Sequence, residues 1–232
     1  MLKKTFFAAS AAAAILALAP LTHGHDEHNS TSVAHANPGS QLGEVTPGAY
    51  TLDKTHAHLT IYVGHLGGIS DYRINFTDFD ATLDFQPENL TASTLSMSVN
   101  PLSVATNYPG DYKKGHANSG FESWDEDIAR NATWLNADKF PKMSFTTTNV
   151  EKTGDNTGKV TGDLELLGVK KPITFDVTFN GVANPPWYGD RDVIGFNAET
   201  TIKRSEFSMD HLIPNVTDDV KITFSGEFLK DQ

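Results

Sequence analysis

The stretch from Lys159 to Phe179, KVTGDLELLGVKKPITFDVTF, constrains the fold more than any other part of the chain. Apolar residues occupy every second position on both sides of Gly168. They are Leu164 and Leu166 before the break, and Ile173, Phe175, Val177 and Phe179 after it. Successive side chains of a strand point to opposite faces, so this pattern predicts a β-hairpin with one apolar and one polar face. Gly168 supplies the backbone freedom for the reversal.

The same alternation recurs along most of the chain from residue 48 onward. It predicts strands within 48–68, 70–86, 95–99, 142–150, 193–202 and 220–228, in addition to the hairpin. We expect a bulge at Asp53-Lys54-Thr55 and a change of phase at Thr77-Asp78. The segment from Tyr108 to Phe140 lacks this period and allows a short helix at Glu122–Ala129, so we interpret it as an excursion over one end of the sheet.

These patterns predict an all-β domain of roughly eight to ten antiparallel strands, arranged as a sandwich or a closed barrel. A sheet with one apolar face and no amphipathic helices to cover it must bury that face against itself, and closure also removes exposed edges. A barrel of about eight strands can be filled by side chains or can hold one ligand. Alternation alone does not distinguish the two.

The first residues indicate export. Lys3 and Lys4 precede an apolar run from Phe6 to Ala19, which predicts a cleaved signal peptide at 1–24, with a retained anchor as the alternative. Residues 25–46 are small and polar, and we interpret them as a flexible histidine-rich leader before a domain at 47–232. The chain has no cysteine, which fits a domain held by its core in a bacterial periplasm.

Net charge limits the partners. The full chain carries a formal charge of -11, and loss of residues 1–24 removes two lysines and no acid, which gives -13. A chain this acidic, with no basic cluster, is repelled by nucleic acid, so we expect no nucleic-acid partner.

The hairpin also resembles a known motif. G-x-L-x-L-x-G-V-x-x-P, which runs from Gly162 to Pro172, is similar to the signature hairpin of the YceI-like family of periplasmic lipid-binding proteins. Further agreements follow in order: Tyr50-x-Leu52-Asp53-x-x-His56, His65-Leu66-Gly67-Gly68-Ile69-Ser70, Arg130-Asn131-x-x-Trp134-Leu135, Gly195-Phe196-x-Ala198, Lys203-Arg204-Ser205-x-Phe207 and Asp219-Val220-x-Ile222. The resemblance implies an extended, lipocalin-like antiparallel β-barrel. It also implies a long-chain amphiphile in the interior, such as a polyisoprenoid or an isoprenoid quinone.

Two departures from the family pattern concern the polar end of such a ligand. An insert at 108–124 interrupts the pattern, and Ile128 stands where the family has a histidine. The head-group contacts are therefore expected to differ, and the insert to lengthen a lid at the barrel mouth.

The predicted ligand-binding residues form three groups. The interior group is Leu59, Ile61, Val63, Phe76, Phe85, Phe145, Phe175, Phe179 and Phe196. Such side chains suit a lipid tail, and they suit a filled core equally. His65 lies on the inward phase near a strand end, where it either binds a head group or is satisfied by neighbouring backbone. Arg130 and Trp134 lie in the excursion, where they either contact a phosphate or quinone ring or, for Arg130, form a salt bridge.

The alternative function is metal binding. The leader histidines His25, His28 and His35 could bind metal or serve as a solvated spacer, and His56 and His58 share one face of a strand at i and i+2. We predict no catalytic centre and no cofactor, because no nucleophile elbow, phosphate loop or H-E-x-x-H motif is present. The oligomeric state is left open, with a homodimer as one option.

Overall fold

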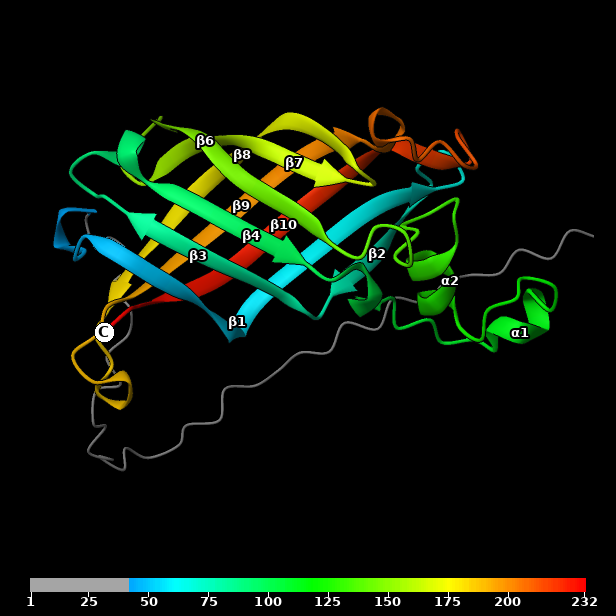
Figure 1. Cartoon of the computed structure of the whole chain (residues 1–232), viewed down its shortest axis with the longest axis horizontal. Helices are drawn as coiled ribbons and strands as arrows, with labels where there is room; N and C mark the ends of the chain where they lie inside the picture. The colour runs from blue at the N-terminus through cyan, green and yellow to red at the C-terminus, as the bar shows by residue number, and fades with distance from the viewer. Residues whose placement is uncertain (1–41) are drawn as a thin grey trace, which may run out of the picture. The chain divides into compact units, whose positions relative to one another are not determined.

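The computed structural model describes residues 42–232, which form an antiparallel β-barrel (Figure 1). The strands are β1 (Gly48–His65), β2 (Ser70–Phe76), β3 (Phe79–Phe85), β4 (Thr94–Val99), β5 (Val104–Ala105), β6 (Met143–Lys152), β7 (Thr157–Leu166), β8 (Val169–Ala183), β9 (Val193–Lys203) and β10 (Val216–Lys230). Two short helices, α1 (Tyr112–Gly115) and α2 (Trp124–Arg130), lie between β5 and β6. Single 3-10 turns occupy Leu42–Glu44, Leu90–Ala92, Pro101–Ser103, Pro186–Tyr188 and Arg204–Phe207.

Eight strands form the closed ring, in the order β10-β9-β8-β7-β6-β4-β3-β1, and β1 pairs with β10 to complete it. Strand β1 is long enough to pair with two successive strands along its other edge. Gly48–Thr51 pairs with β3, and Leu59–His65 pairs with β2. The predicted all-β barrel of about eight strands is therefore confirmed.

Both predicted irregularities mark places where the ring bends. Thr77-Asp78 is the point at which the chain passes from β2 to β3. In β1 the register with β10 shifts between Leu52 and Ala57, as expected for a bulge at Asp53-Lys54-Thr55.

The β7–β8 hairpin turns on two residues. Leu167 and Gly168 have φ of 52° and 74°, the left-handed pair that matches the twist of flanking strands. Within β7, Gly162 lies beneath the ring of Phe145, and a Cβ added there would approach the carbonyl oxygen of Thr146 to 2.5 Å. Only glycine therefore fits at position 162.

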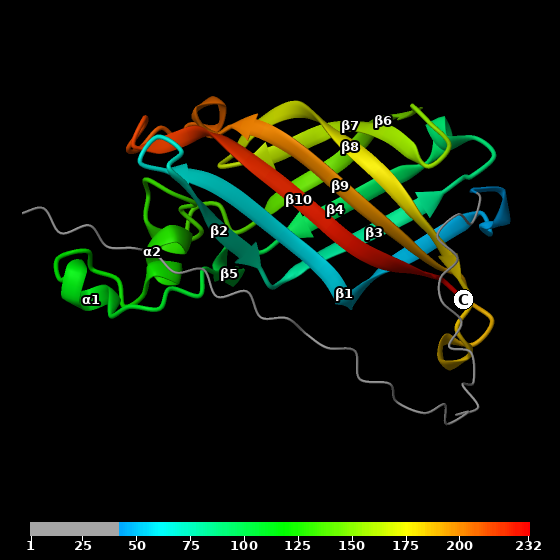
Figure 2. The same ribbon diagram turned by 180° about the vertical axis from the view of Figure 1, so that it is seen from behind.

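The excursion covers one end of the barrel, where α2 packs on β5 and the Pro101–Ser103 turn (Figures 1 and 2). Its helix begins later than the predicted Glu122–Ala129, because the Ser123 hydroxyl caps it by accepting the Glu126 N–H at 3.0 Å. The sequence pattern did not reveal α1, which is a single turn capped by Asp111.

The described fold begins before the predicted boundary at residue 47. Leu42–Glu44 forms a 3-10 turn, Val45 is buried, and the Thr46 N–H donates to Asp192 Oδ2 at 2.6 Å. Residues 42–46 thus belong to the folded part rather than to the leader. The predicted signal peptide and the rest of the predicted leader lie outside the described residues. Within residues 42–232, no helix is long and apolar enough to cross a membrane.

Aromatic side chains are packed most densely at the end of the barrel away from α2. Phe196 contacts Phe85, Phe179 and Phe228, with ring centroids 5.7, 5.5 and 6.1 Å apart. Interlocked rings of this kind leave little room between facing strands. The opposite end, beneath α2, is hollow.

Candidate ligand-binding cavity

A cavity of about 540 Å³ occupies the end of the barrel that α2 covers. Its walls come mainly from the inward side chains of the strands, for example Ile61 and Val63 on β1, Leu164 on β7 and Ile222 on β10. Ile61, Val63 and Ile222 are partly accessible although they face the interior, because they border empty space. The barrel is therefore hollow at this end.

Most of the predicted ligand-binding residues line one of two cavities. Leu59, Ile61, Val63, His65, Phe76, Trp134, Phe145 and Phe175 line the large one. Phe85, Phe179 and Phe196 line a second cavity of about 170 Å³ at the aromatic end, together with Phe145 and Phe175. Arg130 lines neither, since its guanidinium forms ion pairs with Asp138 and Glu126 on the surface.

Three side chains, Met97, Phe145 and Phe175, line both cavities and form the wall between them. The rings of Phe145 and Phe175 meet edge to face at 5.3 Å between centroids. The interior would be continuous if these side chains changed rotamer.

The mouth of the large cavity has an apolar rim. Leu66 and Leu212 are 55% and 48% exposed, and both have left-handed φ values, 49° and 61°. Leu212 and the exposed His65 also line the cavity. The Gly67 N–H donates to the Asn215 carbonyl at 3.1 Å, which ties the two rim loops together.

Arg204 is a cavity residue that the sequence patterns did not single out. It is 3% exposed, and its guanidinium donates to the carbonyls of Thr217, Met209, His211 and Val216 at 2.8 to 2.9 Å. The guanidinium also lies 5.7 Å from the Trp134 ring. Burial lowers the pKa of Arg204, whereas the negative charges of Asp218 and Asp210 act to raise it. The one available signal was its place in the segment Lys203-Arg204-Ser205.

The insert at 108–124 adds aromatic side chains to the cavity. The ring of His116 stacks on Tyr112 at 4.5 Å and on Trp124 at 5.7 Å, and His116 and Trp124 line the cavity. Beneath the stack, the Tyr112 hydroxyl donates to Asp127. The insert therefore presents flat rings at the end of the cavity farthest from the aromatic core.

Tyr72 places a polar atom in this apolar surrounding. Its buried hydroxyl has no hydrogen-bond partner of acceptable geometry within residues 42–232. Burial raises the pKa of Tyr72, while the nearby Thr106 and Trp124 act in the opposite direction. The hydroxyl is enclosed by the side chains around it, so a ligand could reach it only if one of those side chains moved.

Of the two histidines predicted to share a metal, only His56 belongs to a group of three neighbouring ligand residues within the described part of the chain. His58 is exposed beside Thr60 and Ser225 on the outer face of the barrel. His56 instead lies 2.9 Å from Asp53, measured from Nδ1 to Oδ2.

A family model described as the YceI-like domain matches residues 50–228. The chain belongs to the YceI-like family. A YceI-like relative from Pseudomonas putida, described as a UPF0312 protein, is 36% identical over 169 residues, which cover 72% of this chain and 79% of the relative.

Solved structures share the YceI-like fold. The crystal structure of BcnA from Burkholderia cenocepacia matches with a TM-score of 0.62 at 18% identity, covering 78% of this chain and 99% of that one. A polyisoprenoid binding domain from Saccharophagus degradans, implicated in plant cell wall breakdown, matches with a TM-score of 0.55 at 14% identity, covering 80% and 99% of the two chains. At these identities the two structures support the fold alone.

Proposed function

We propose that this protein binds and carries one long-chain amphiphilic lipid, a polyisoprenoid or an isoprenoid quinone, inside its barrel. The observation that carries the proposal is the large cavity of about 540 Å³ with walls built largely of carbon. Its volume falls within the usual range for small-molecule sites. The polyisoprenoid-binding domain that shares the fold supports the same class of ligand.

The energy of binding would come mainly from the tail. Each buried methylene contributes about 0.8 kcal/mol, so chain length dominates affinity. The wall at Met97, Phe145 and Phe175 sets how deep a tail reaches. A short tail fits above this wall, and a longer tail extends into the second cavity only when the wall moves.

The head group would lie at the α2 end. His116 and Trp124 offer ring faces there, and the enclosed Tyr72 hydroxyl would offer a donor once a ligand displaces the side chains around it. A flat head group with a carbonyl oxygen, such as a quinone ring, satisfies both features. The exposed apolar rim at Leu66 and Leu212 would let the lipid enter the cavity along an apolar surface.

The place of action in this proposal is the periplasm. It rests on the predicted signal peptide at 1–24 and on the absence of cysteine from the chain. Binding and transport, with no catalytic step, are the whole of the proposed activity.

The test is native mass spectrometry of protein purified without detergent, followed by organic extraction. We expect one long-chain lipid per barrel in the wild type and none in Phe175→Asp, which puts a charge into the cavity wall. The matched control is Thr174→Asp, the same new side chain one position along β8 on the outer face, which should keep its lipid. Wild-type protein without lipid, or Phe175→Asp with lipid, would overturn the proposal. The same spectra report whether the protein is a homodimer.

A further inference from the structure

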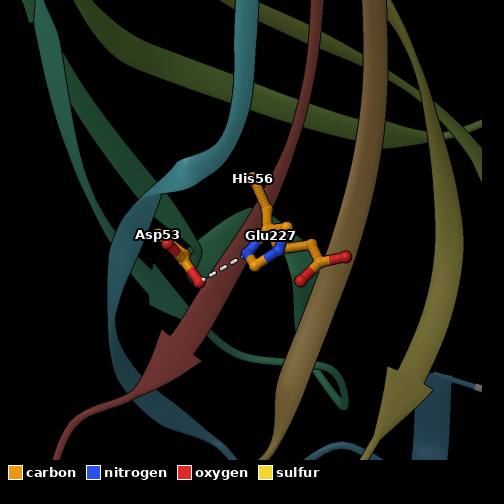
Figure 3. A group of neighbouring side chains, drawn as sticks. All are labelled: Asp53, His56 and Glu227. Atoms are coloured by element: carbon orange, nitrogen blue, oxygen red, sulfur yellow. Dashed lines mark hydrogen bonds and ion pairs between the residues drawn. The ribbon is translucent and has the colours of Figure 1, made fainter.

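The bulge in β1 builds a second polar cluster outside the lipid cavity. Leu52 pairs with Phe228 and Ala57 pairs with Gly226, so the four residues 53–56 lie opposite the single residue Glu227 of β10. The extra residues bring Asp53 and His56 around the side chain of Glu227 (Figure 3). One ligand atom from each of these three residues lies within 4.8 Å of the other two.

Asp53 is fixed in place by its surroundings. Its side chain is 9% exposed, and its Oδ1 accepts the Thr55 N–H at 2.9 Å and the Thr55 hydroxyl at 2.6 Å. Its Oδ2 accepts the Tyr188 hydroxyl at 2.8 Å and lies 2.9 Å from His56 Nδ1. Burial alone would raise the pKa of Asp53, but these hydrogen bonds outweigh burial and lower it, so the carboxylate is ionised at neutral pH.

Glu227 is the part of the cluster that the protein leaves uncompensated. Its side chain is half-buried and forms no hydrogen bond or ion pair within residues 42–232. The pKa of His56 and that of Tyr188 are raised by the hydrogen bond to Asp53 and, to a smaller degree, by the charge of Glu227. Two carboxylates face one imidazole, so the cluster keeps a net negative charge even when His56 is protonated. A divalent cation would neutralise both carboxylates at once.

We propose that Asp53, His56 and Glu227 bind a divalent transition-metal ion of the Zn²⁺ type. Imidazole nitrogen and carboxylate oxygen are ligands that Zn²⁺ accepts at about 2.0–2.2 Å, with water in the remaining position. The histidine disfavours Ca²⁺ and Mg²⁺, which prefer oxygen ligands.

Closing the site requires little rearrangement. Ligand atoms around a tetrahedral Zn²⁺ are roughly 3.4 Å apart, which follows from those bond lengths. Glu227 has no interaction to break, so its side chain can rotate toward the metal while Asp53 and its bonds to Thr55 and Tyr188 stay in place. The proposed site contains His56, one of the two histidines of the predicted pair, together with the carboxylates of Asp53 and Glu227.

The test is a calorimetric titration of the untagged full chain with Zn²⁺. So that the leader histidines cannot contribute to the signal, all variants are made in a background with His23, His25, His28 and His35 changed to serine. We expect one Zn²⁺ per chain, with affinity lowered at least tenfold by His56→Ala and by Glu227→Gln. The matched control is His58→Ala, a histidine two positions along the same strand, which should change the affinity less than twofold.

A thermal measurement separates loss of the site from loss of the fold. Zn²⁺ should raise the melting temperature of the background and of His58→Ala, but leave that of Glu227→Gln unchanged, because only a bound ligand stabilises the native state. The proposal would be overturned by no Zn²⁺ binding in the background, or by Zn²⁺ binding in His56→Ala and Glu227→Gln as tight as in the background. None of the three residues lines the lipid cavity, so the result is independent of the lipid proposal.

Discussion

The rings of Phe145 and Phe175 meet edge to face, with centroids 5.3 Å apart and planes at 85°, on the wall between the two interior cavities. This contact joins β6 to β8 over the inner face of β7, where Gly162 leaves room for the Phe145 ring. If the proposed function holds, this contact would limit the length of a lipid tail that enters from the α2 end.

Removing the Phe175 ring from this contact should shift the preference of the protein toward lipids with longer tails. Phe175→Ala joins the two cavities, and each further methylene buried is worth about 0.8 kcal/mol, or roughly a fourfold gain in affinity. The measurement is a binding series over isoprenoids of increasing length, with Phe175→Leu as the control that keeps most of the wall. An unchanged length preference in Phe175→Ala would show that the wall does not limit the tail.

Gly162→Ala should destabilise the fold, although alanine is usually better than glycine in a strand. The new methyl group meets the Thr146 carbonyl oxygen and the Phe145 ring, and such overpacking costs about 1–3 kcal/mol. Urea unfolding measures the difference. Gly115→Ala is the control, because nothing lies within 4 Å of its added Cβ, and it should be neutral.

Arg204→Lys should loosen the loop at 209–217. Lysine keeps the charge, but it lacks the planar guanidinium that donates to four carbonyls at once. Each lost hydrogen bond from a charged donor costs about 1.5–3 kcal/mol of stability. We expect faster hydrogen exchange in the loop and a lower melting temperature. The surface variant Arg130→Lys should change neither, since exposed ion pairs contribute little.

Tyr72→Phe should separate lipid binding from stability. The Tyr72 hydroxyl is buried without a partner in the described residues, so its removal should leave the free protein as stable as the wild type or more so. A ligand that accepts this hydroxyl should bind about tenfold more weakly to the variant, which corresponds to one hydrogen bond of about 1.4 kcal/mol. Equal affinity for a quinone-headed lipid would show that the head group lies elsewhere.

Asp192 should control stability in acid. Burial alone would raise the pKa of Asp192, but hydrogen bonds from Thr46 and Asn184 outweigh burial and lower it. The Tyr50 hydroxyl adds another at 3.2 Å. Since the folded pKa lies below the unfolded value of about 3.9, this stabilisation is complete above that pH and is lost as the pH falls through the folded pKa.

Asp192→Asn removes this dependence. The advantage of the wild type in unfolding free energy over Asp192→Asn should be constant near neutral pH and shrink below about pH 4. Denaturant titrations at a series of pH values measure it. Parallel curves down to pH 3 would mean that Asp192 is not linked to folding.

The alternation was sufficient for most of the strands because its information is local, whereas the choice of a barrel over a sandwich came from the resemblance to the YceI-like family. A period of two residues shows which side chains face inward, and the breaks at Asp53-Lys54-Thr55 and Thr77-Asp78 show where strands bend. Strand ends were less certain, since β8 and β10 extend beyond their apolar runs into Ala183 and Lys230. At these strand ends, hydrogen bonding to a neighbouring strand decides where the strand stops, and the alternation of apolar residues does not.

The hollow interior was beyond sequence reasoning for a physical reason. Phe145 and Phe196 have the same inward phase, yet one borders the large cavity and the other packs into the aromatic core. Which of these happens depends on side chains that face them across the barrel. Arg204 escaped notice for a similar reason, because its four partners are backbone carbonyls that no residue pattern reveals.

The pairing of β1 with β10 sets the order of events when the protein is made. The Thr223 hydroxyl donates to the Thr60 carbonyl across 163 residues of sequence. Strand β1 therefore cannot complete its pairing until β10 has been synthesised. Until β10 arrives, β1 and β9 present open edges and the barrel has no interior to load. In the proposed function, a lipid would therefore be enclosed in the final step of folding or enter afterwards through the mouth. A chain that stops short of β10 would be an aggregation hazard rather than a weaker carrier.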